Sequence, residues 1–149
     1  MNVLIIGFGT AGKFYFNLLK NNKNIAKIFV CDDVILPKDP KIFKISFDIN
    51  LIKKNKINYA FVSTPSNLHY KYSRILIKNS INVLIEKPFV LRITHAKELI
   101  KLSRNKKIKC WVSFQNRYNL AIQGLKKIVK KGTLGKIFLV DCSLIWKRD

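Results

Sequence analysis

A glycine-rich turn near the start of the chain restricts the possible folds more than any other feature. The sequence G-F-G-T-A-G at residues 7–12 directly follows the apolar run 3–6 and opens a helical pattern over residues 10–22. In such a turn the first glycine allows a tight reversal and the second lets backbone amides approach a pyrophosphate. The third allows close packing of helix on strand. The spacing predicts a dinucleotide-binding turn.

An acidic residue follows at the distance that this kind of turn requires. Asp32 lies 20 residues after Gly12, at the end of the apolar run 28–31. A carboxylate at this position can bind the ribose hydroxyls of adenosine and repels a 2′-phosphate, so we expect NAD rather than NADP. Asp33 could do the same, and Lys38 could weaken the preference. On these residues alone, an ordinary glycine-rich turn with a loop acid stays open as the alternative.

Short apolar runs alternate with helical patterns along the rest of the chain. The expected strands are 3–6, 28–31, 42–47, 59–62, 83–85, 108–114 and 136–146, and the expected helices are 10–22, 49–54, 68–78, 94–105 and 120–131. Phe14, Leu18 and Leu19 share one face of the first helix, and Thr94 is the expected N-cap of the fourth. The alternation predicts an α/β fold, a doubly wound Rossmann-type parallel sheet.

The last expected strand points to a second domain. One face of 136–146 is wholly apolar, with Phe138, Val140 and Cys142 among its residues. Such a strand needs a sheet beside it, because an unpaired apolar edge aggregates. We therefore expect a dinucleotide-binding domain over residues 1–114 and an incomplete second domain over residues 115–149.

The charge has two interpretations. Lys and Arg number 29 against 8 Asp and Glu, which gives a net charge of +21. A basic excess attracts nucleic acid, but binding sites there combine clustered Lys and Arg with aromatic residues. Here 24 of the 29 are scattered lysines, and Lys, Ile and Asn together fill 59 of 149 positions, a pattern typical of A/T-rich codons. We expect no specific nucleic-acid partner, with a basic nucleic-acid-binding protein as the weaker alternative.

Several other classes are excluded by the pattern of apolar and cysteine residues. The N-terminus has no basic region before its short apolar run, and no segment has the length of a membrane span, so we expect neither a signal peptide nor a membrane partner. Cys31, Cys110 and Cys142 are odd in number and far apart. They are expected to be small buried side chains in a reducing, cytoplasmic compartment, not a disulfide or metal site.

Two clusters of polar residues come directly after expected strands. The sequence S-T-P-S-N-L-H over residues 63–69 follows the third buried strand, and Glu86-Lys87-Pro88 follows the fourth. Ligands of parallel sheets bind at these carboxyl ends. His69 by itself is better explained as a packing residue of a first helical turn, and a Glu-Lys pair is usually solvated. Pro88 constrains the turn, could follow a cis bond, and could direct Lys87 into a cleft.

The combination of these motifs resembles a known family. G-F-G-T-A-G, S-T-P-S-N-L-H, I-E-K-P-F, F-Q-N-R-Y-N and K-K-G-T-L-G-K-I, in this order, are similar to the motifs of the Gfo/Idh/MocA oxidoreductases. The segments 115–119 and 146–148 most resemble the nucleotide-sugar 3-dehydrogenases. Those enzymes act on UDP-N-acetylglucosamine-type uronates in surface-polysaccharide synthesis.

The resemblance implies an activity and roles for individual residues. It implies an NAD(P)-dependent dehydrogenase acting on CH–OH groups, with an α+β open-sheet substrate and oligomerisation domain that begins after residue 114. A homo-oligomer is expected for a full-length form. The residues expected to bind the cofactor are Gly7, Phe8, Gly9, Thr10, Ala11, Gly12, Asp32, Asp33, Ser63, Thr64, Pro65, His69 and Glu86. Lys87 is the expected catalytic residue, and Lys87, Asn116, Arg117 and Tyr118 are expected to bind a sugar or nucleotide-sugar substrate.

The sequence also departs from that family. Its members are usually more than twice as long and carry a D-x-x-x-H motif, whereas the only histidines here are His69 and His95. Ser80 stands where the family commonly has glycine, and the crossover after Asp32 is short. An inactive, NAD-binding remnant is therefore the main alternative to an active dehydrogenase.

Overall fold

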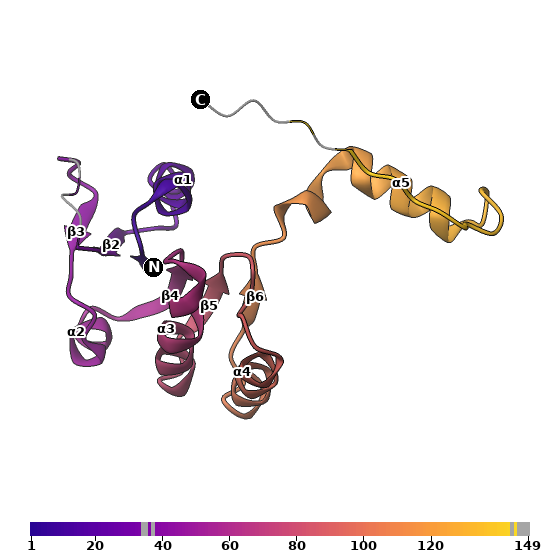
Figure 1. Cartoon of the computed structure of the whole chain (residues 1–149). Coiled ribbons are helices and arrows are strands. Elements are labelled where there is room, and N and C mark those ends of the chain that lie inside the picture. The colour runs from indigo at the N-terminus through magenta and orange to yellow at the C-terminus, as the bar shows by residue number, and fades with distance from the viewer. Residues whose placement is uncertain (34–35, 37, 144, 146–149) are drawn as a thin grey trace. The chain divides into compact units, whose positions relative to one another are not determined.

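The described residues of the computed structural model are 1–33, 36, 38–143 and 145, and they form two units, Met1–Ser113 and Phe114–Asp149. The first unit is built on a parallel sheet with the strand order β3-β2-β1-β4-β5-β6 (Figure 1). Its strands are β1 Asn2–Ile6, β2 Lys27–Cys31, β3 Ile42–Lys44, β4 Ile57–Val62, β5 Asn82–Ile85 and β6 Cys110–Val112. Its helices are α1 Thr10–Leu19, α2 Ile49–Lys54, α3 Ser66–Lys78 and α4 Ile93–Asn105.

Helices lie on both faces of this sheet, which is why its strands are apolar on both sides. Figure 1 shows α1 on one face and α2, α3 and α4 on the other. Along β1, Val3 and Ile5 point into the core under α1, whereas Leu4 and Ile6 point into the core that the other helices cover. The predicted doubly wound Rossmann-type sheet is confirmed.

The order in which strands are added to the sheet reverses at β1, because β2 and β3 lie on one side of it and β4, β5 and β6 lie on the other. This strand pairs with β2 on one side and with β4 on the other, and Ile6 is in register with both Cys31 and Val62. The carboxyl ends of the three strands therefore lie next to one another. This topological switch point is where ligands bind in open α/β sheets.

The buried face of α1 is not the one that the sequence pattern predicted. Gly12, Tyr15 and Phe16 are buried and Leu19 packs partly buried against the same core, while Phe14 and Leu18 are 62% and 63% exposed. The prediction was wrong for Phe14 and Leu18 because Gly12, which has no side chain, is the closest point between helix and strand. Its position sets the rotation of the helix, and residues three and four positions later then face the sheet.

Other helix ends also differ from prediction. Thr94 is not an N-cap: α4 begins at Ile93, and Arg92 carries the extended backbone of the cap position with no side-chain hydrogen bond. The first helix ends at Leu19 instead of residue 22. The crossover from β2 to β3 contains no helix among its described residues, as the short segment after Asp32 predicted.

The second unit contains two helical segments and no strand among its described residues. A short 3₁₀ helix, Gln115–Tyr118, precedes α5, Leu120–Lys130, which Asn119 caps through a 2.9 Å bond from the Ala121 amide to its side-chain oxygen. The predicted strand 136–146 is wrong over residues 136–143 and 145, and its residues 144 and 146 lie outside the described part. A strand needs a hydrogen-bonded neighbour, and no described residue of this unit provides one.

The three cysteines are less buried than predicted. Cys31 and Cys110 are half-buried and Cys142 is exposed. Burial raises the pKa of the Cys110 thiol to about 11, so this thiol stays protonated at neutral pH. Within the described part of the chain, no helix combines the length and the apolar character needed to cross a bilayer.

The orientation of α1 gives a stability prediction with an internal control. Phe16→Ala should lower the free energy of unfolding by about 3–5 kcal/mol, because Phe16 fills the core between α1 and the sheet. Phe14→Ala, two residues away on the exposed side, should change it by less than about 0.5 kcal/mol. Urea denaturation of both variants measures the difference, and equal losses would contradict the orientation of the helix.

Candidate functional site

The glycine turn is closed against the ends of β1, β2 and β4. Gly7 has a positive φ of 88° and its amide donates to the Cys31 carbonyl at 3.0 Å. A Cβ atom on Gly7 would lie 2.7 Å from the Ser63 backbone, and one on Gly12 would lie 2.1 Å from the Gly7 carbonyl oxygen. Both positions therefore require glycine.

Gly9, unlike Gly7 and Gly12, has open space around its Cα atom. A Cβ atom built on this residue meets no protein atom within 4 Å, so the space in front of the turn is open. This space lies at the first residues of α1, where free amide groups and the helix dipole favour negative charge. The turn thus has the closed back and open front that a dinucleotide pyrophosphate requires.

Asp32 and Ser63 hold the turn from its two sides. An Asp32 carboxylate oxygen accepts a hydrogen bond from the Phe8 amide. The Ser63 hydroxyl lies 2.8 Å from the Gly7 carbonyl oxygen and 3.1 Å from that of Ile6. The sequence predicts Asp32 as a ribose ligand. In the structure its carboxylate fixes the glycine turn, a role that the sequence did not indicate.

A pocket of about 430 Å³ lies beside Asp32 and Asp33. The aromatic rings of Phe47 and Tyr72 form one wall, with their centroids 4.7 Å apart and their planes at 75°. One pocket is thus bordered by two aromatic rings and two carboxylates. No sequence pattern indicated Phe47 and Tyr72, because they come from segments without a motif and meet only in the folded chain. The pocket is lined by Cys31, Asp32, Asp33, Lys44, Ile45, Ser46, Phe47 and Tyr72.

His69 connects the two loops at the ends of β4 and β5. It is buried, and its ring nitrogens lie 2.9 Å from the carbonyl oxygens of Thr64 and Pro88. Both ends of the ring thus contact backbone. The adjacent Thr64 hydroxyl oxygen is buried and has no hydrogen-bond partner in the described part of the chain. An orphaned polar atom beside the turn is consistent with a ligand at this edge.

The segment after β5 has an unusual backbone and a free amine. The Lys87–Pro88 peptide bond is cis. The Glu86 carboxylate accepts from the Tyr15 hydroxyl through one oxygen and from the Lys87 amide, at 3.0 Å, through the other. The Lys87 side chain is exposed, and its amine has no ion pair among the described residues. Glu86 therefore holds the backbone of Lys87 and leaves its amine available.

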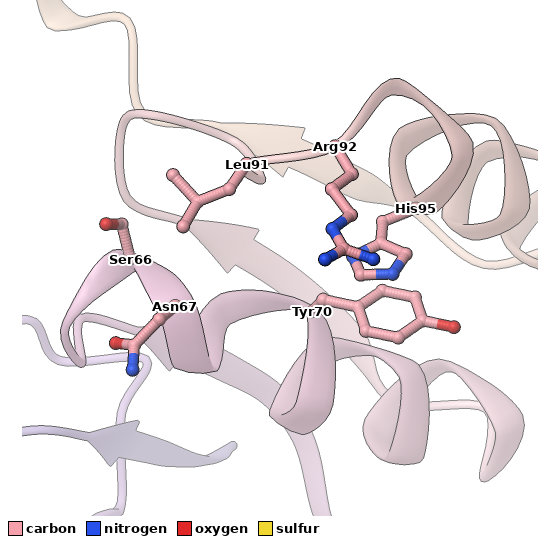
Figure 2. Close-up of a pocket in the computed structure, with 6 residues that line it drawn as sticks. All are labelled: Ser66, Asn67, Tyr70, Leu91, Arg92 and His95. Atoms are coloured by element: carbon pink, nitrogen blue, oxygen red, sulfur yellow. The ribbon is translucent and has the colours of Figure 1, made fainter.

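A further pocket, of about 410 Å³, lies between the first turns of α3 and α4 (Figure 2). The rings of Tyr70 and His95 stack at 3.7 Å, and Figure 2 shows the Arg92 guanidinium next to His95. The Tyr70 hydroxyl donates to Glu98 at 2.5 Å, and Arg74 pairs with the same carboxylate at 2.6 Å. These two contacts lower the pKa of Glu98. Ser66 and Asn67 of the motif at residues 63–69 line this pocket, whereas no sequence motif indicated Tyr70 or Arg92.

The predicted substrate residues Asn116, Arg117 and Tyr118 belong to the second unit. They lie in the 3₁₀ helix before α5, and the Arg117 guanidinium is 5.3 Å from the ring centroid of Phe114. A pocket of about 330 Å³ is lined by Arg117, Tyr118, Gln123, Lys126, Lys127 and Lys130. Residues 146–148, part of the predicted subgroup motif, lie outside the described residues.

The geometry agrees with the comparisons to known proteins. Residues 1–114 match the profile of an oxidoreductase family with an NAD-binding Rossmann fold, GFO_IDH_MocA. The uncharacterised oxidoreductase YhhX of Escherichia coli is 26% identical over 148 residues, which are 95% of this chain and 43% of that protein. The scyllo-inositol 2-dehydrogenase IolW of Bacillus subtilis is 23% identical over 141 residues, or 92% of this chain and 39% of that protein. The chain thus spans about two fifths of the length of these relatives.

Solved structures share the fold at low sequence identity. The WlbA dehydrogenase from Bordetella pertussis, in complex with NADH and UDP-GlcNAcA, has a TM-score of 0.78 and 21% identity, covering 93% of this chain and 42% of that chain. A scyllo-inositol dehydrogenase from Lactobacillus casei with bound NAD(H) and scyllo-inositol has a TM-score of 0.78 and 18% identity, with coverages of 91% and 42%.

Two glycines of the turn should respond differently to the same change. Gly9→Ala should leave the melting temperature unchanged, because its Cβ meets no protein atom, but should weaken NADH binding at least about tenfold by filling the open space. Gly12→Ala should lower the melting temperature, since its Cβ would collide with the Gly7 carbonyl. Fluorescence titration and thermal unfolding test both, and unchanged NADH affinity in Gly9→Ala would contradict the proposed site.

Tyr15 gives a prediction about pH. Burial, followed by the bond to Glu86, raises the pKa of its phenol well above the ordinary value. A raised pKa in the folded state stabilises the fold below the ordinary pKa of about 10, and this contribution is lost as the pH rises further. The free energy of unfolding should therefore fall above about pH 10, and fall less steeply in Tyr15→Phe. Equal slopes for the two proteins in urea denaturation at several pH values would contradict this assignment.

Proposed function

The chain belongs to the Gfo/Idh/MocA family of oxidoreductases with an NAD-binding Rossmann fold, and we propose that it forms the cofactor-binding part of a dehydrogenase that oxidises a sugar hydroxyl. One observation carries this proposal. The exposed amine of Lys87 stands at the carboxyl edge of the sheet, the same edge that carries the glycine turn and Asp32. A proton acceptor and a dinucleotide site at one edge are the two parts that oxidation of an alcohol needs.

The chain's own residues have distinct tasks in this reaction. Bound at this site, NAD would supply the hydride acceptor for the carbon of the CH–OH group. The open turn at Gly9 would hold its pyrophosphate, and Asp32 and Asp33 would bind the adenosine ribose and disfavour a 2′-phosphate. The substrate hydroxyl loses its proton to the amine of Lys87, which must be neutral to accept it. Thr64 and His69 border the nicotinamide side of the site.

We propose a nucleotide sugar as the substrate, a UDP-N-acetylhexosaminuronate oxidised at C3 in surface-polysaccharide synthesis. This choice is supported by the motif at residues 115–119. It is also supported by the WlbA dehydrogenases of Bordetella pertussis and Chromobacterium violaceum, whose structures contain NADH and UDP-GlcNAcA. The second candidate substrate is an inositol, which the relatives from Bacillus and Lactobacillus favour.

The alternative to an active enzyme is an NAD-binding remnant. The chain spans about two fifths of the length of the matched relatives. An enzyme and a remnant both bind NADH, but only the enzyme reduces NAD in the presence of a sugar.

Substitution of Lys87 tests the proposed chemistry. Lys87→Ala should reduce the rate of NAD reduction with the best substrate of a panel of UDP-sugars and inositols by about 10²–10⁴-fold, because it removes the proton acceptor. Its NADH affinity should stay within about threefold of the original value. Lys97→Ala, which removes an exposed lysine of α4, is the matched control and should leave both quantities unchanged.

Two results would contradict the proposal in different ways. Unchanged turnover in Lys87→Ala would remove Lys87 from the mechanism. Tight NADH binding by the original chain without turnover of any sugar would favour the remnant.

A further inference from the structure

A buried tyrosine that the proposed chemistry does not use joins three elements of the site. Tyr15 comes from α1, three residues after the last glycine of the turn, and is only 4% exposed. Its hydroxyl reaches the Glu86 carboxylate at the end of β5 and lies 2.8 Å from the Ser113 hydroxyl, just after β6. No sequence motif marks this residue, because its partners are 71 and 98 positions away.

The chemistry of the three groups fixes the direction of the bonds. An ionised carboxylate only accepts hydrogen bonds, and a phenol has one proton to donate. The Tyr15 proton therefore goes to Glu86, and the Ser113 hydroxyl donates to the Tyr15 oxygen. The second oxygen of Glu86 accepts from the Lys87 amide at 3.0 Å. The result is a continuous chain of hydrogen bonds from Ser113 to the backbone of Lys87.

Both ends of this chain are fixed to the sheet. The Glu86 amide donates to the Val62 carbonyl at 2.9 Å, and the Ser113 amide donates to the Ile85 carbonyl at 2.9 Å. The Tyr15 ring packs against Phe61, with 5.1 Å between the ring centroids. Burial raises the pKa of the phenol, so the hydroxyl remains protonated and can donate at every ordinary pH.

We propose that Tyr15 is a positioning residue, which fixes the Glu86 carboxylate and through it the backbone from which Lys87 presents its amine. This inference rests on the proposed function of Lys87. Because α1 starts in the glycine turn, one short helix both borders the cofactor space and holds the end of the strand that carries the proton acceptor.

A purely structural role for Tyr15 makes different predictions. A ring that only fills the core would be replaced by phenylalanine without effect on Lys87, since the two rings have the same shape. The effect of removing the hydroxyl alone is therefore the informative quantity. Tyr59→Phe is the matched control, because Tyr59 is a half-buried tyrosine of the same apolar cluster and makes no hydrogen bond to Glu86 or Lys87 within the described part of the chain.

The experiment combines amide hydrogen exchange, followed by NMR, with steady-state kinetics on the same variants. In Tyr15→Phe, exchange of the Lys87 amide should be at least about tenfold faster, because Glu86 is no longer held in place to accept from it. The kcat for the sugar should fall by roughly 10–100-fold, the effect of a small misplacement, while KM and NADH affinity stay within about threefold. Tyr59→Phe should match the original protein in every measurement.

Glu86→Gln approaches the same bond from the other side and leaves the core unchanged, so it tests the inference even if Tyr15→Phe is poorly folded. The double variant should lose no more kcat than the more affected single variant, because both substitutions break one connection. Additive losses of kcat in the double variant would overturn the inference. An unchanged exchange rate of the Lys87 amide, or an unchanged kcat, in Tyr15→Phe would also overturn it.

The two proposals fail in distinguishable ways. If the original chain turns over no sugar, the proposed function fails, and the exchange of the Lys87 amide alone decides whether Tyr15 holds this backbone. If turnover is present but Tyr15→Phe leaves it unchanged, Lys87 keeps its role and only the positioning role is wrong.

Discussion

The close contact between Gly12 of α1 and the carbonyl of Gly7 at the end of β1 is the constraint on which the rest of the site depends. With only 2.1 Å between that oxygen and a hypothetical Cβ, no other residue allows the helix to approach the strand so closely. This approach opens the front of the turn at Gly9. It also sets the rotation of the helix, and the rotation buries Tyr15 and Phe16. The open space for the cofactor and the hydrogen bond between Tyr15 and Glu86 therefore both result from the close approach of Gly12 to Gly7.

The sheet edge is held together by polar groups that contact backbone. Asp32 binds the Phe8 amide, Ser63 contacts the Gly7 carbonyl, and His69 spans the loops at Thr64 and Pro88. Each of these side chains was expected to touch a ligand, and each also fixes a loop. Such an arrangement keeps the edge preorganised, which lowers the entropy that binding must overcome.

Features encoded within a short segment could be predicted from the sequence. The turn at residues 7–12 has its own pattern of glycines, α2 begins and ends where the apolar spacing predicted, and Ser80 has the positive φ of 61° that the family's glycine suggested. Features that depend on distant residues could not be predicted. Phe47 and Tyr72 come from distant segments and meet only in the folded chain, and the apolar stretch 136–143 predicts a strand that requires a neighbour in the same unit.

The sequence pattern failed for α1 for a related reason. Phe14 and Leu18 are as apolar as the residues that are buried, and nothing in their spacing shows that a glycine determines the contact face. A turn motif that dictates close helix–strand packing is better evidence for the buried face than the number of apolar residues. By the same reasoning, Tyr15 could have been singled out as the residue one helical turn beyond Gly12.

The central claim is that NAD binds at the carboxyl edge between the glycine turn and the end of β5. Titration of the ¹⁵N-labelled chain with NAD, followed by amide chemical shifts, tests it most directly. The largest shifts are expected at Phe8, Gly9, Asp32 and Thr64, with a further response at Lys87. Shifts confined to other residues, such as the pocket at Arg92 and His95, or no shifts at all, would contradict it.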